Sequence, residues 1–154
     1  MYFRGRSSRS LDPKGRLMLP PEFRESLAAR GRACADPGVR SEAAPAPTEG
    51  EEVRFVITTY DGLVAYPWAD WEDLEQKFAR LPNPSPKVRA FRRLFIGGAE
   101  VQTLDAQGRV RLSQDHRDYA RLGKEVMVLG LINRFELWNP EALKATMDAQ
   151  KLDD

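Results

Sequence analysis

The stretch SLDPKGRLML at residues 10–19 returns 93 positions further along the chain as TLDAQGRVRL at residues 103–112. Both copies contain a Leu-Asp pair, a Gly-Arg pair and a final leucine. In each copy the pattern predicts a strand, a turn at Asp-x-x-Gly and a second strand with alternating apolar residues. A supersecondary unit that recurs within one chain predicts two copies of one folding unit.

The segments that follow the two motifs also correspond. A short helix is predicted after each, at residues 22–27 behind Pro20-Pro21 and at residues 114–122 behind the N-cap Ser113. A strand pair comes next in each half, and the four strands are expected at residues 53–60, 63–66, 125–132 and 135–138. The first pair turns at Asp61-Gly62, a strong hairpin signal, and the second at Asn133-Arg134.

A helix is expected to close each half. Asp70 is the predicted cap of the first closing helix, and Asn139, followed by Pro140, is the predicted cap of the second.

These elements define a domain plan. We expect a first unit at residues 1–80, a linker at 81–98 that carries an amphipathic helix, a second unit at 99–147 and a short acidic tail at 148–154. The first unit contains about 21 residues more than the second, and they fall within residues 31–50. That segment is rich in Pro and Ala and holds one large aliphatic residue, so we predict a flexible, dispensable loop. Cys34 in this loop is expected to be a free thiol without a function.

Composition restricts the class of protein. Apolar residues make up 42% of the 154, which is enough for a packed core, and no apolar run reaches the length of a membrane span. The basic N-terminus lacks an apolar stretch behind it, so we expect a cytoplasmic protein rather than a secreted one. The single cysteine excludes an internal disulfide and a Cys-only metal site.

Charge is unevenly distributed although the net charge is only +1. Residues 1–40 hold nine basic and four acidic side chains, and residues 87–93 form a second basic cluster. A basic front suits a polyanion as partner, but a set of solvated charged faces is an equally good interpretation of charge alone.

The chemistry of the repeated motif is that of a rigid turn. The carboxylates of Asp12 and Asp105 are suited to accept backbone N–H groups, and Gly15 and Gly108 to adopt positive φ.

The motif arginines, Arg16 and Arg109, then project from the edge of a strand beside the turn. In that position a guanidinium is able to bind a phosphate or a guanine edge. Lys14 adds a further positive charge. An ordinary hairpin whose arginine pairs with its own aspartate remains the alternative for each motif.

Several short stretches together resemble the MraZ family. They are MYFRG at residues 1–5, LDPKGR at 11–16, PPEFR at 20–24, YP at 66–67, WE at 71–72, RLFIGGAE at 93–100, the second motif at 104–109 and FELW at 135–138.

This resemblance implies an α+β fold related to the AbrB-type regulators, in which swapped hairpins of two units form one small β-barrel. Here the two halves of one chain would form the pseudo-dimer, as tandem SpoVT-AbrB-like units with short flanking helices.

The resemblance also implies a function. Family members are bacterial, nucleoid-associated transcriptional regulators that bind direct repeats in double-stranded DNA upstream of their own division and cell-wall gene cluster, as ring-shaped homo-oligomers. It assigns DNA binding to the motif arginines Arg16 and Arg109, with Lys14 and Gly15 beside the first. Arg4, Arg6 and Arg9 precede the first motif and are expected to add phosphate contacts. Gln107 replaces Lys14 in the second copy, which predicts unequal roles for the two turns.

Other functions fit this sequence less well. No nucleophile motif, phosphate loop or metal-ligand spacing is present, and the single histidine, His116, is expected on a helix face, so we predict neither enzyme activity nor a cofactor, metal or small-molecule substrate. A toxin-binding antitoxin of this type is expected to have one unit and a disordered tail, whereas this chain has two units. A scaffold that binds only protein is a further alternative. Such a scaffold would show no salt-dependent affinity for DNA, which distinguishes it from a DNA-binding regulator.

Overall fold

The structure, a computed structural model, describes residues 2–33, 53–81 and 85–152. Its strands are β1 (Phe3–Ser10), β2 (Arg16–Met18), β3 (Arg54–Tyr60), β4 (Gly62–Pro67), β5 (Glu100–Thr103), β6 (Arg109–Arg111), β7 (Glu125–Ile132) and β8 (Phe135–Trp138). Its helices are α1 (Pro21–Ala33), α2 (Trp68–Ala79), α3 (Pro86–Phe95), α4 (Gln114–Tyr119) and α5 (Pro140–Leu152). This mixture of helices and antiparallel strands confirms the α+β class, and both strand pairs lie where the sequence predicts them.

Strand pairing crosses between the two halves of the chain. The large sheet has the order β1-β7-β8-β4-β3-β5, so the first strand of each half pairs with the hairpin of the other half. The two hairpins meet through β4 and β8 at the centre. The strands that follow the two motifs, β2 and β6, pair with each other in a separate two-stranded ribbon.

The described strands do not close into the barrel that the family resemblance implies. The six-stranded sheet has β1 and β5 as its open edges. Each motif turn reverses the chain directly after an edge strand, and β2 meets the end of the first strand only through one isolated bridge, Leu11 to Leu17. β2 and β6, of three residues each, pair with each other outside the six-stranded sheet.

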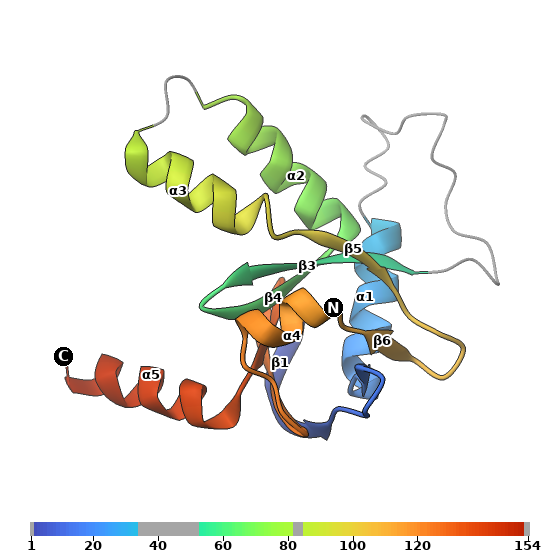
Figure 1. Cartoon of the computed structure of the whole chain (residues 1–154). Helices are drawn as coiled ribbons and strands as arrows, with labels where there is room; N and C mark the ends of the chain where they lie inside the picture. The colour runs from blue at the N-terminus through green and yellow to red at the C-terminus, as the bar shows by residue number, and fades with distance from the viewer. Residues whose placement is uncertain (1, 34–52, 82–84, 153–154) are drawn as a thin grey trace.

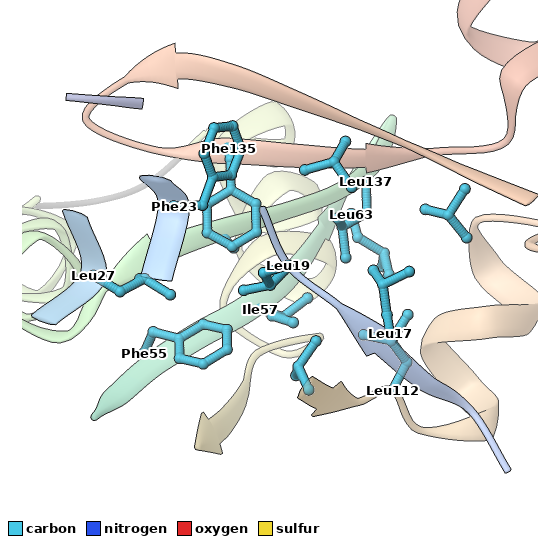
Figure 2. Packing of buried hydrophobic residues seen from close by; sticks show 14 of the residues in the cluster. Leu17, Leu19, Phe23, Leu27, Phe55, Ile57, Leu63, Leu112, Phe135 and Leu137 are labelled. Carbon is cyan, nitrogen blue, oxygen red and sulfur yellow. The ribbon is translucent and has the colours of Figure 1, made fainter. Parts of the chain in front are cut away.

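One apolar cluster joins both halves. Aromatic rings from β1, α1 and β8 meet at its centre, where the ring of Phe135 lies 5.2 Å from Phe3 and 5.3 Å from Phe23. Leu17 in β2 and Leu112, the residue after β6, enter the same cluster (Figure 2). Each motif is therefore attached to a core that neither half forms alone.

Helices α2 and α3 lie side by side over the outer face of β3 and β4 (Figure 1). Phe95 on α3 stacks on Phe91 and packs against Trp71 of α2. The amphipathic helix predicted in the linker is thus confirmed as α3, with Ser85 as its N-cap. Helix α5 instead projects away from the rest of the chain in Figure 1.

Two local predictions are wrong. Asp70 does not cap α2, which begins at Trp68, so that Asp70 lies inside the first turn, where its negative charge suits the helix dipole. The expected loop at 31–50 begins too early, because α1 continues through residue 33; residues 34–50, with Cys34, lie outside the described residues. The predicted cap at Asn139 is confirmed, since its Oδ1 accepts the backbone N–H groups of Glu141 and Ala142. None of the helices in the described ranges is long and apolar enough to cross a bilayer.

Candidate nucleic-acid interface

The first motif folds into a turn held by its own aspartate. Asp12 Oδ1 accepts the backbone N–H of Lys14 at 2.9 Å and that of Arg16 at 2.8 Å. The Gly15 N–H donates to the Asp12 carbonyl at 3.0 Å, and Gly15 has a φ of +84°. The turn is therefore closed by backbone groups, and glycine supplies a conformation that other residues rarely adopt.

The second turn reproduces the first. Asp105 Oδ1 accepts the backbone N–H groups of Gln107 and Arg109, both at 2.9 Å, and Gly108 has a φ of +82°.

Each motif arginine also bonds to its aspartate. Arg16 Nε lies 2.6 Å from Asp12 Oδ2, and Arg109 Nε lies 2.8 Å from Asp105 Oδ2. The intramotif ion pair that the sequence leaves open as an alternative is thus present in both copies. A guanidinium has five N–H donors, and the contact through Nε uses one of them. Arg109 donates a second, from Nη2 to Gln107 Oε1 at 3.3 Å. The ion pair consequently orients each arginine and leaves donors for a ligand.

The two aspartates remain ionised over a wide pH range. Hydrogen bonding from the backbone N–H of Arg16 lowers the pKa of Asp12 below its ordinary value of 3.8, and the backbone N–H of Arg109 does the same for Asp105. A carboxylate whose pKa is lower in the folded chain stabilises the fold above its unfolded pKa. This contribution is complete at neutral pH and is lost as the pH falls below about 4 through the lowered pKa.

The ribbon places the arginines on one face. Leu17 is paired directly with Val110, and both are fully buried. Because side chains alternate across a strand, the flanking residues lie on the opposite face of the ribbon: Arg16, Met18, Arg109 and Arg111. The antiparallel register sets the two turns at opposite ends of this outer face.

Two further arginines lie against the turns, and each comes from the helix that follows the other motif. Arg117 on α4 lies beside Gly15, where a Cβ would be 3.0 Å from its Cζ, and Arg24 on α1 packs closely against Gly108. Neither residue is among the site residues predicted from the sequence. Their separation of 93 positions, the same as that of the motifs, is the signal that would have found them.

The three arginines before the first motif do not share one location. Arg4 and Arg6 are exposed on the same face of β1, whereas Arg9 has the opposite orientation and donates through Nε to Ser7 Oγ at 3.0 Å. Arg6 lies next to α5, with Nη1 3.7 Å from Met147 Sδ. The structure thus brings Lys14, Arg16, Arg109 and Arg111 together around the ribbon and directs Arg6 to a different surface.

His116 has a structural environment. It is buried on α4, and its Nε2 lies 2.7 Å from the Gly98 carbonyl oxygen and 3.1 Å from a Glu100 carboxylate oxygen. This confirms its expected place on a helix face. Among the described residues, no group of three or more His, Cys, Asp or Glu side chains is arranged to hold a metal ion.

Comparison with known proteins identifies related chains. A family model described as "MraZ protein, putative antitoxin-like" matches residues 95–152. The chain is 51% identical to a protein named transcriptional regulator MraZ from Nitratidesulfovibrio vulgaris strain Hildenborough, over 100% of this chain and 91% of the relative. Proteins of the same name from Oleidesulfovibrio alaskensis and Acidithiobacillus ferrooxidans are 49% and 39% identical, over 96% and 89% of this chain and 87% and 82% of theirs. That name denotes a regulator and not a class of enzyme.

Two of the three positive-φ glycines in the described residues, Gly5 and Gly15, allow the packing of the turn to be tested. Their φ values are +85° and +84°, but a Cβ at Gly5 meets open space, whereas a Cβ at Gly15 would lie 2.8 Å from the Leu112 carbonyl oxygen. We expect Gly5→Ala to lower the free energy of unfolding by about 1 kcal/mol through backbone strain alone. Gly15→Ala should cost roughly 1–3 kcal/mol more, because the added methyl group also overpacks the ribbon. Urea unfolding measures both, and equal losses would contradict this account of the turn.

Proposed function

The chain belongs to the MraZ family, and on that premise we propose that it regulates transcription by binding duplex DNA with the outer face of the β2–β6 ribbon. The observation that carries the proposal is the presentation of both Asp-x-x-Gly-Arg turns at the two ends of one arginine-bearing face. Guanidinium groups held in place by a rigid turn suit phosphate oxygens and the O6 and N7 atoms of guanine. Arg16 and Arg109 would read the DNA, and Lys14 would contact phosphate.

We infer further that the two halves, residues 1–80 and 99–147, act as a pseudo-dimer related to the AbrB-type regulators. The crossed pairing of β1 with β7 and of β5 with β3 supports this relationship. The proposed target is a set of direct repeats upstream of the chain's own gene, within a division and cell-wall gene cluster. The protein would accordingly act in the cytoplasm on nucleoid DNA.

Footprinting of the protein on the DNA upstream of its own gene tests this function. We expect evenly spaced protected segments whose occupancy falls as the salt concentration rises, because phosphate contacts release counterions. A random-sequence duplex of the same length serves as the control for nonspecific binding. A footprint that remains blank at protein concentrations that saturate the random duplex would refute the regulator proposal.

The two motif arginines should contribute unequally to binding. Lys14 and Arg111 accompany Arg16 at its end of the ribbon, whereas Gln107 and Met18 accompany Arg109. We expect Arg16→Ala to weaken binding more than Arg109→Ala, and each to lower the salt slope by roughly one. Arg16→Lys should also bind DNA weakly, since lysine cannot reproduce the forked contact of a guanidinium. Fluorescence anisotropy with variants that retain their circular dichroism spectra measures these effects; a larger loss for Arg109→Ala would show that the second turn is the main reader.

We also propose that the protein assembles as a homo-oligomeric ring and that the outer face of β7 and α5 forms its subunit contact. Val56 and Thr58 on the outer face of β3 are buried beneath α2 and α3. In the second hairpin Met127 occupies the position that Val56 has in the first, because Met127 pairs with Trp138 as Val56 pairs with Tyr66. Unlike Val56, Met127 is only half-buried. A groove of about 260 Å³ between β7 and α5 has apolar walls formed by Met127, Pro140, Leu143 and Met147, and the charged side chains of Arg6, Lys144 and Asp148 also line it. A second copy of the chain would cover this groove as α3 covers the first hairpin.

Substitution of Met147, a half-buried residue of α5, tests the assembly. We expect Met147→Asp to reduce the mass measured by light scattering at micromolar protein, because a carboxylate would be desolvated in an apolar contact. The exposed Ala145 on the same helix provides a control, and Ala145→Asp should leave the mass of the wild-type oligomer unchanged. A monomeric wild-type mass would contradict the ring.

A further inference from the structure

Arg111 is the direct cross-strand partner of Arg16 on the outer face of the ribbon. Both residues flank the buried pair of Leu17 and Val110, so neither side chain enters the core. Directly opposed residues of an antiparallel pair have Cβ atoms about 4.5–5.5 Å apart. Two positive side chains therefore start from adjacent positions on the same solvent-facing surface.

This arrangement is unfavourable in the free protein. Like charges directly opposite each other destabilise an antiparallel pair. The charge of Arg16 is balanced by Asp12 through the 2.6 Å ion pair. Arg111 is exposed and makes no side-chain hydrogen bond or ion pair with any residue in the described part of the chain. An anion that binds both guanidinium groups would relieve the repulsion, which marks the pair as a place for a phosphate or a guanine edge.

The other end of the ribbon is different. There Met18 lies opposite Arg109, and Gln107 takes the position that Lys14 has in the first turn. In the repeat, Met18 corresponds to Arg111 and Lys14 to Gln107. The backbone of the ribbon is therefore nearly symmetric between the two repeats, whereas its charge is concentrated at the Arg16 end.

We propose that Arg111 contacts DNA together with Arg16 and that the difference between Arg111 and Met18 fixes the orientation of the ribbon on its site. This inference rests on the proposed function. A symmetric ribbon would bind a symmetric phosphate backbone equally well in two opposite orientations. Additional cationic contacts at one end favour the orientation that places this end on the more strongly bound half of the site. A preferred direction lets successive copies of the chain bind direct repeats head to tail.

Three variants test the proposal without changing the core: Arg111→Met, Met18→Arg and the double exchange Met18→Arg/Arg111→Met. The double variant has the same composition of charge as the wild type, with one arginine moved from one end of the ribbon to the other. Affinities and salt slopes are measured by fluorescence anisotropy for two probes: the duplex upstream of the chain's own gene and a random-sequence duplex of equal length. Thermal unfolding verifies that each variant is folded.

We expect Arg111→Met to weaken binding to the upstream duplex about tenfold and to lower the salt slope by roughly one. The double exchange should restore affinity for the random duplex, where only total charge matters, but not for the upstream duplex, where direction matters. Wild-type affinity of Arg111→Met for the upstream duplex would overturn the contact. Full recovery on that duplex by the double exchange would overturn the directional role. Failure of the wild type to bind either probe would instead refute the proposed function, and with it this inference.

Discussion

The buried pairing of Leu17 with Val110 is the constraint on which the candidate site depends. Burial of each of these side chains contributes about 1.5–3 kcal/mol, whereas an exposed ion pair contributes about 0–1 kcal/mol. The apolar pair, which is fully buried, therefore determines the register of the ribbon, and the charged residues follow from it. Alternation then leaves the neighbouring arginines on the outer face, and the antiparallel direction separates the two turns. The hydrophobic effect thus positions the groups that carry the proposed chemistry.

The two turns also depend on each other through the helices. The turn at Gly15 packs against Arg117, whose helix α4 begins at the N-cap Ser113 directly behind the second motif. The turn at Gly108 packs against Arg24, whose helix α1 follows the first motif. Each half therefore supplies part of the support for the other half's turn, in addition to the crossed strands of the sheet. The outer face of the ribbon is consequently a property of the whole chain and not of either repeat.

Local patterns predicted much of this structure, and non-local register accounts for what they did not predict. Strand alternation and turn chemistry located both hairpins, and Asn139 with Pro140 located the start of α5. The cap at Asp70 was wrong because α2 begins at Trp68, directly after β4, so that Asp70 lies within its first turn. The pairing of Arg16 with Arg111 was out of reach, because it joins strands far apart in the sequence and single-copy patterns carry no register between them. The open sheet also depends on which distant strands pair with each other, and the sequence repeat alone does not determine that pairing.

The ion pair between Arg16 and Asp12 is compatible with DNA binding in the proposed complex. A free arginine loses rotamer entropy when it is ordered at an interface, at a cost of about 0.5–1.5 kcal/mol. The bond from Arg16 Nε to Asp12 Oδ2 orders the side chain before a ligand arrives, so part of this cost is met during folding. The carboxylate weakens the attraction of Arg16 for phosphate by the same contact. Arg111, which has no such counter-charge in the described part of the chain, would supply the net positive charge that Arg16 lacks. In the proposed complex, the ordered side chain of Arg16 would provide geometric selectivity, and the neighbouring Arg111, whose charge is not balanced, would provide electrostatic attraction.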